Sequence, residues 1–97
     1  AEDFEGFLQQ FRKSIANHQV RLKEQVSAGD VTAIRRTAHS LKGLCSQVGA
    51  ERIGNIAAWL EEESHDAAMV STILPRLDLG IQEVCEALDR ETAGAAH

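Results

Sequence analysis

Apolar residues recur along this chain at intervals of three, four and seven in four successive segments. In the first segment they are Phe4, Phe7, Leu8, Phe11, Ile15, Leu22 and Val26. Such spacing is typical of amphipathic α-helices, in which one side of each helix packs against its neighbours. Tyrosine is absent and aromatic residues make up only 4% of the chain, so little in the composition favours strands. The pattern therefore predicts an all-α protein.

Glycines and capping residues divide the pattern into four predicted helices. The first ends near Ala28-Gly29, because glycine commonly follows a helix, and Asp30 can cap the second. The second ends at Gly49, and residues 64–66 form the last turn. The inward positions of the later helices are Val31, Ile34, Ala38, Leu41, Cys45 and Val48, then Ile53, Ile56, Ala57 and Leu60, then Val70, Ile73, Leu74, Leu77, Ile81, Val84 and Leu88.

Short connections between four amphipathic helices predict an antiparallel, up-down-up-down four-helix bundle. We expect residues 1–91 to form this single domain and residues 92–97 to form a frayed tail. Pro75 lies inside the fourth apolar pattern, where it removes a backbone donor. It therefore predicts a kink or a late start of the last helix.

Size and charge restrict the classes of partner. A chain of 97 residues fits one domain, and its net charge of −5 argues against nucleic acid or an anionic membrane as the main partner. No apolar run of about 18 residues and no signal-peptide pattern is present, so no membrane insertion is expected. Cys45 and Cys85 lie on apolar stripes and are interpreted as free thiols of a cytoplasmic protein. A monomer is expected, because the bundle uses all four apolar stripes.

The stretch from Ala38 to Gly43 carries the strongest chemical signal. On a helical wheel His39 lies roughly 140° from the centre of the apolar stripe, so it is not a core residue. Lys42 and Gly43 flank it one turn later, and a cation suits an anionic group on the ring while glycine leaves room for a large partner. Its further neighbours on this face are Arg35, Arg36 and Ser46. The alternative is an ordinary solvated helix face that includes a histidine.

Glu61 is expected at the same level of the bundle as His39. His39 is ten positions before Gly49, and Glu61 is eleven after Ala50, which places both roughly 15–17 Å from the turn at about 1.5 Å per residue. A carboxylate that accepts a hydrogen bond from Nδ1–H would leave Nε2 with its lone pair, as a nucleophile requires. Alternatively, Glu61 is one more member of an acidic run at a helix end.

The segment from Ala38 to Glu61 resembles the histidine phosphotransfer (Hpt) domain of multistep two-component signalling. The matching residues are Ala38, His39, Leu41, Lys42, Gly43, Gly49, Ile53, Ile56, Leu60 and Glu61. The family has leucine where Ile53 and Ile56 stand, a change that preserves the core. Trp59 occupies a position that is more often polar in the family, and we interpret it as a helix-packing residue rather than a partner contact.

The resemblance implies that His39 accepts a phosphoryl group, that Lys42 neutralises its charge, and that Gly43 admits the partner. It places Glu61 where the family has a glutamine or glutamate near the histidine. From their position on the same face of the helix, Arg35, Arg36 and Ser46 are expected to contact the partner. Members of this family exchange phosphate with an aspartate of a receiver domain, which supplies Mg²⁺. This chain is therefore expected to bind no cofactor itself.

No ATP-binding segment is visible, so the chain is expected to be a phosphotransfer module rather than a kinase in its own right. Because the sequence begins without methionine, the C-terminal, cytoplasmic domain of a hybrid sensor histidine kinase is favoured over a free-standing shuttle. The phosphoryl group would pass from one receiver aspartate through His39 to the aspartate of a response regulator.

Two other function classes remain open. A metal or haem site could use His18, His39, His65 or Met69, but no Cys-x-x-Cys-His or His-x-x-x-His spacing supports it. A non-catalytic helical docking module for a signalling partner would leave His39 idle. His18 is interpreted as a packed boundary residue, His65 as a turn residue and His97 as part of the terminus.

Overall fold

The computed structural model describes the backbone of residues 2–95 and the side chains of residues 5–90. Four helices occupy this part of the chain: α1 spans Glu2–Ala28, α2 Val31–Val48, α3 Glu51–Glu63 and α4 Ala67–Ala95. The described backbone contains no strand, which confirms the all-α prediction. None of these helices is both long enough and apolar enough to cross a membrane.

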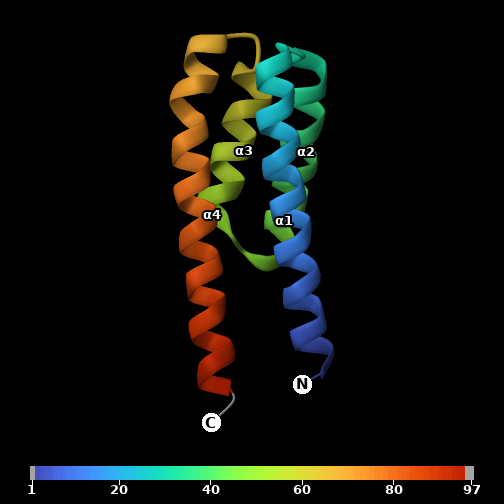
Figure 1. Ribbon diagram of the computed structural model, residues 1–97, viewed down its shortest axis with the longest axis vertical. Helices are drawn as coiled ribbons and strands as arrows, with labels where there is room; N and C mark the ends of the chain where they lie inside the picture. Colours follow the sequence, from blue (N-terminus) through green and yellow to red (C-terminus); the bar gives the residue numbers. More distant parts are fainter. Residues whose placement is uncertain (1, 96–97) are drawn as a thin grey trace.

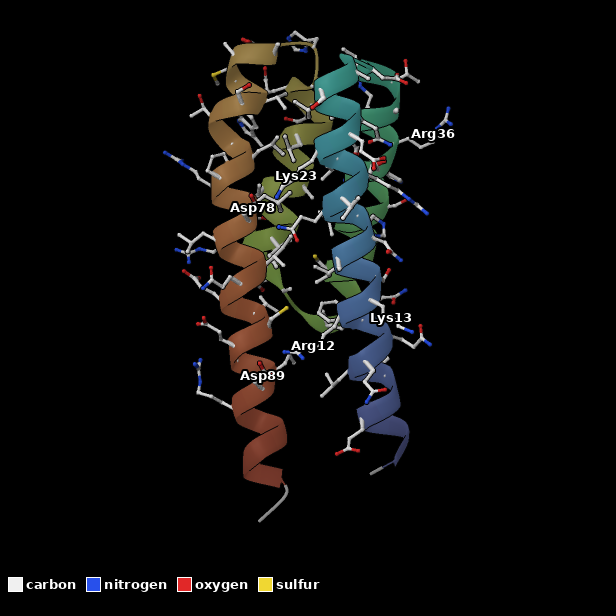
Figure 2. All side chains as sticks on the ribbon, viewed as in Figure 1. Arg12, Lys13, Lys23, Arg36, Asp78 and Asp89 are labelled. Atoms are coloured by element: carbon white, nitrogen blue, oxygen red, sulfur yellow. The ribbon has the colours of Figure 1, made fainter. Side chains whose placement is uncertain are left out.

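The helices form an antiparallel bundle in which each one packs against two neighbours. α1 contacts α2 and α4, and α3 contacts the same two helices from the other side. Successive helices run in opposite directions, and α1 and α4 extend past the turn between α2 and α3 (Figure 1). Lys23 and Asp78, and also Arg12 and Asp89, form ion pairs that join α1 to α4 (Figure 2). The predicted up-down-up-down four-helix bundle is confirmed.

The turns have the predicted capping residues. Gly29 and Gly49 have φ values of 68° and 73°, in the left-handed region that favours glycine. The Asp30 carboxylate accepts a hydrogen bond from the Ala33 backbone N–H at 3.1 Å, as a helix N-cap does. Asp66 accepts from Met69 in the same way at the start of α4. These local interactions explain why α2 begins at Val31 and why α1 and α2 end where they do.

One continuous core runs along the axis of the bundle. Its buried residues are Phe11, Ile15, Leu22, Ile34, Ala38, Leu41, Cys45, Ile53, Ala57, Leu60, Val70, Leu77 and Ile81. Cys45 and Cys85 are both free, as predicted; Cys45 is buried and Cys85 is half-buried. Burial raises the pKa of the Cys45 thiol to about 11, so this thiol stays protonated at neutral pH.

Two residues assigned to apolar stripes are exposed instead. Val31 is the first residue of α2, where the helix has only just entered the bundle. Phe7 lies near the α2–α3 turn, where the neighbouring helices end, and its ring stacks on Phe11. Periodicity cannot detect such positions, because it carries no information on where neighbouring helices stop.

The last helix differs from the prediction at both ends. α4 begins at Ala67, before Pro75, so of the two predicted alternatives, a kink or a late start, the late start is wrong. Pro75 has no N–H to donate to the Ser71 carbonyl, but both residues are exposed and water can replace that bond. α4 also continues to Ala95, so residues 92–95 are helical rather than part of a frayed tail. Ala93 and Ala95 favour this extension, because alanine has the highest helix propensity; residues 96 and 97 lie outside the described part.

Candidate functional site

His39 lies on the solvent face of α2, near the middle of the helix. Its side chain is 70% exposed, whereas Ala38 and Leu41 beside it are fully buried. The buried residues fix the rotation of α2 about its axis, so the histidine is directed outward. The prediction that His39 is not a core residue is confirmed.

Glu61 of α3 contacts the His39 ring from the neighbouring helix. Its two carboxylate oxygens lie 3.0 and 3.2 Å from Nδ1 of His39. An ionised carboxylate can only accept hydrogen bonds, so Nδ1 carries the proton and donates it to Glu61. In the neutral ring this leaves Nε2 with a free lone pair. The contact expected from the matched distances to the α2–α3 turn is therefore present.

Lys42 shares the Glu61 carboxylate with His39. Its Nζ lies 3.7 Å from Oε2 of Glu61. The hydrogen bond from His39, followed by the positive charge of Lys42, keeps the pKa of Glu61 below its usual value of 4.5, although partial burial opposes this shift. Glu61 is thus ionised at neutral pH, and it places an imidazole and an ammonium group side by side.

Gly43 leaves the surface open one turn after His39. A Cβ placed on Gly43 would have no neighbouring heavy atom within 4 Å. Its φ is not positive, so the backbone does not require glycine at this position. What glycine contributes here is free space, as the sequence predicts.

The other polar residues of this face are exposed as well. Arg35, Arg36 and Ser46 are accessible on the side of α2 that carries His39. Arg36 extends outward from α2 (Figure 2). Ser46 and Lys42 line a shallow cleft of about 410 Å³ between α2 and the start of α3. The structure therefore brings the predicted partner-binding residues onto one surface with His39.

The residues considered for a metal site lie apart. His18 of α1 is half-buried, and its Nδ1 is 2.6 Å from the carbonyl oxygen of Ser14. His65 lies in the α3–α4 turn, 3.8 Å from Glu63, and Met69 is on α4. Among residues with described side chains, no three His, Cys, Asp or Glu residues are grouped so that they could bind a metal. His97 lies outside the described residues.

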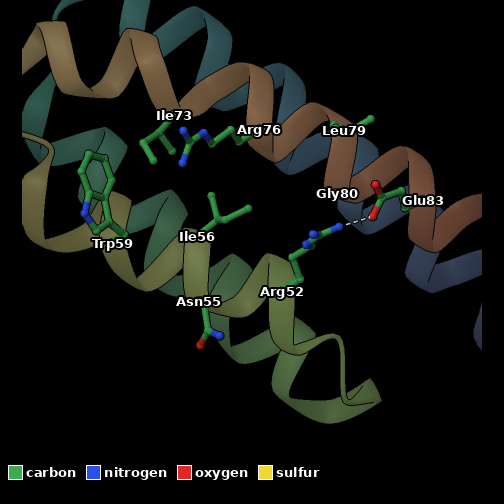
Figure 3. Close-up of a pocket in the computed structure, with 9 residues that line it drawn as sticks. All are labelled: Arg52, Asn55, Ile56, Trp59, Ile73, Arg76, Leu79, Gly80 and Glu83. Atoms are coloured by element: carbon green, nitrogen blue, oxygen red, sulfur yellow. Dashed lines mark hydrogen bonds and ion pairs between the residues drawn. The ribbon is translucent and has the colours of Figure 1, made fainter.

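A groove between α3 and α4 is a feature that the sequence pattern does not predict. It has a volume of about 610 Å³, and an ion pair of 2.5 Å between Arg52 and Glu83 crosses it (Figure 3). Trp59 is half-buried at one end of the groove, on the same side of α3 as Ile56. The sequence feature that marks this contact between α3 and α4 is Gly80. An added Cβ there would lie 3.4 Å from Ile53, so glycine permits close packing of the two helices.

An antiparallel four-helix bundle that presents an exposed histidine hydrogen-bonded to a carboxylate, and flanked by a lysine and an open glycine, is suited to carry a group on that histidine. The family model of the Hpt domain matches residues 6–91, and the chain belongs to this family. It is thus a histidine-containing phosphotransfer module of two-component signalling, a class whose partners are receiver domains. No curated protein and no solved structure matches the chain.

Proposed function

We propose that Nε2 of His39 accepts a phosphoryl group from the aspartyl phosphate of a receiver domain and passes it to the aspartate of a response regulator. The observation that carries this proposal is the 3.0 Å contact between Nδ1 of His39 and Glu61. It assigns the ring proton to Nδ1 and leaves the nucleophilic nitrogen on the exposed side of the ring. Such an arrangement prepares a histidine to attack without loss of a proton.

In the forward step the Nε2 lone pair forms a bond to phosphorus while the bond from phosphorus to the aspartate oxygen breaks. The electron pair of that bond leaves with the aspartate carboxylate. The proton remains on Nδ1, so the phosphorylated ring carries a positive charge that the Glu61 carboxylate stabilises. Because atoms and charges balance in both directions, the same geometry serves the reverse transfer.

Lys42 would stabilise the phosphoryl group. Its ammonium lies one turn from His39 and is 44% exposed, so it can exchange its contact with Glu61 for one with a phosphoryl oxygen. Phosphoryl transfer depends mainly on positioning and on such electrostatic stabilisation. The Mg²⁺ ion that assists the transfer would be supplied by the receiver, as the family resemblance implies.

The open surface at Gly43 would allow the receiver to approach the ring, with Arg35, Arg36 and Ser46 around the contact. The four apolar helix faces are used within the bundle, which favours a monomer. Two free thiols favour a reducing compartment such as the cytoplasm. We therefore propose a cytoplasmic module that relays phosphate between receivers and takes none directly from ATP.

Transfer from a phosphorylated receiver to the wild-type chain and to its His39→Gln variant tests this proposal. The wild type should acquire phosphate that is labile to acid and stable to base, and the variant should acquire none. The free energy of unfolding of the His39→Gln variant should differ from that of the wild type by less than about 0.5 kcal/mol, because the His39 ring is exposed. Phosphate on the variant would refute the assignment to His39. A folded wild type that no receiver labels would support a docking module instead.

A further inference from the structure

A cleft between α1 and α2 lies beside His39, on the side of α2 away from Glu61. It has a volume of about 310 Å³, and its lining includes His18, Arg21, Gln25, Arg36, Thr37 and Ser40. Ser40 directly follows His39, and Arg36 lies one turn before it. A partner that covers the His39 ring would therefore also cover the edge of this cleft.

One polar side chain in the cleft has unused hydrogen-bonding capacity. Thr37 lines the cleft and is only 8% exposed. Oε1 of Gln25, in the same cleft, is buried and has no hydrogen-bond partner within the described part of the chain. The oxygen and nitrogen of such an amide can be exchanged by a flip, so Gln25 can equally present N–H groups. Buried polar groups are nearly always satisfied in folded proteins, so the unpaired Gln25 side chain indicates a site that a ligand completes.

The charges around the cleft select the ligand. α2 carries three basic residues and no acidic one, although the whole chain has a net charge of −5. Four basic residues outside this cleft form ion pairs with acidic side chains: Arg12, Lys23, Lys42 and Arg52. Arg21 and Arg36 form none with the described side chains, and both line this cleft. The local positive charge is therefore available to an anion.

We propose that the α1–α2 cleft binds a carboxylate side chain of the receiver domain that docks on His39. The inference rests on the proposed function and extends it, because it assigns a determinant of partner choice to a site outside the phosphoryl-transfer centre. Arg21 and Arg36 pair with the carboxylate, since the guanidinium fork matches its two oxygens. The Thr37 hydroxyl donates a further hydrogen bond. Receivers without an acidic residue at this position would dock less tightly.

A titration of the isotopically labelled chain with sodium acetate, followed by NMR, tests the cleft without any receiver. At constant ionic strength, acetate should cause saturable shifts of the Arg21 and Arg36 side-chain N–H signals and of the Thr37 amide, whereas chloride should not. Arg21→Gln should abolish saturation. Arg76→Gln should retain it, because Arg76 is an exposed arginine of α4 that has no described ion pair and lies outside the cleft. The absence of saturable shifts would overturn the proposal.

Two further measurements distinguish a carboxylate subsite from its alternatives. Inorganic phosphate that binds the cleft more tightly than acetate and displaces it would indicate a phosphate site and would overturn the assignment. Thr37→Val keeps the shape of the side chain and removes only the hydroxyl, so the fold should persist while acetate affinity falls several-fold. Unchanged affinity would show that Thr37 is not a ligand.

Receiver kinetics then test the role of the cleft in recognition. With a receiver that phosphorylates wild-type His39, Arg21→Glu should raise KM by about tenfold with little change in kcat, as expected for loss of one charge-assisted hydrogen bond. Arg76→Glu, with the same change of charge, should leave KM unaltered. Equal KM values for Arg21→Glu and the wild type would overturn the inference. Failure of every receiver to label the wild type would instead refute the proposed function, and the acetate titration would still decide whether the cleft binds a carboxylate.

Discussion

The two faces of α2 have opposite chemistry although one helix of 18 residues carries both. On the inner face, Ala38, Leu41 and Cys45 have between 0% and 1% of their surface exposed. On the outer face, the His39 side chain is 70% exposed and that of Lys42 44%, and Gly43 adds no side chain. The inner face thus sets the position of the outer one, which contributes little packing of its own. Stability and phosphoryl transfer should therefore respond to different substitutions.

The largest effect is expected on the inner face. Leu41→Ala should lower the free energy of unfolding by about 2–5 kcal/mol, because it leaves a cavity in a fully buried site. Urea denaturation monitored by circular dichroism measures this loss. The matched control is Leu79→Ala on α4, where the leucine is 56% exposed and the change should stay below about 0.5 kcal/mol. Equal losses at the two positions would contradict the core assignment of Leu41.

A bulky residue on the outer face should separate stability from transfer. Gly43→Leu should reduce the rate of transfer from a receiver by more than about a hundredfold, because the side chain blocks close approach to the ring. The helix itself should become more stable by up to about 1 kcal/mol, since leucine is a better helix former than glycine. Gly43→Ala should give a similar gain in stability with a much smaller loss of transfer. Normal transfer by Gly43→Leu would show that the open surface is not used.

Glu61 joins α3 to the outer face of α2, because its carboxylate contacts the side chains of His39 and Lys42. Glu61→Ala should slow phosphorylation of His39 by about tenfold, the expected cost of losing one hydrogen bond to a charged group. Rapid-quench measurements of transfer from a receiver provide the rate. Glu62→Ala removes the same charge from the neighbouring exposed position and should leave the rate unchanged. If both variants slow transfer equally, the effect is one of net charge and not of the hydrogen bond to His39.

The lowered pKa of the Glu61 carboxylate predicts that the stability of the fold depends on pH. In the folded state the pKa of Glu61 is lowered from its usual value of 4.5. At pH values above 4.5, the contacts of the ionised carboxylate therefore stabilise the folded state fully. This contribution should disappear as the pH falls through the lower, folded-state pKa. The difference in unfolding free energy between the wild type and Glu61→Gln should therefore be constant at neutral pH and shrink in acid. A difference that grows in acid would contradict the assigned direction of the shift.

The last prediction concerns the two thiols, which lie outside the phosphoryl-transfer site. The pKa of Cys45 is raised from 9.0 to about 11, which reduces its thiolate at mildly alkaline pH by about a hundredfold. Cys85 is only half-buried, so iodoacetamide should modify Cys85 well before Cys45 in the folded protein. In urea the two rates should become similar. Mass spectrometry of the alkylated peptides measures both, and rapid native modification of Cys45 would show that the inner face of α2 opens readily.

Much of the fold could be predicted because it depends on local patterns. The helix ends at Gly29 and Gly49 follow from the backbone freedom of glycine, and the start at Val31 follows from the Asp30 cap. The outward direction of His39 follows from its angle to the apolar stripe. Predictions failed where a local rule met a compensating environment, as at Pro75, which an exposed surface tolerates inside α4.

The sequence by itself determined four amphipathic helices, their antiparallel order, and a histidine outside the core beside a lysine and a glycine. These properties depend on residues a few positions apart, whose relative placement the helix geometry dictates. The tertiary structure alone decided that Glu61 reaches both His39 and Lys42, that Gln25 lacks a partner for its buried oxygen in a basic cleft, and that a groove opens beside Trp59. Contacts between helices depend on their axial offset and rotation, which the packing of the whole core sets.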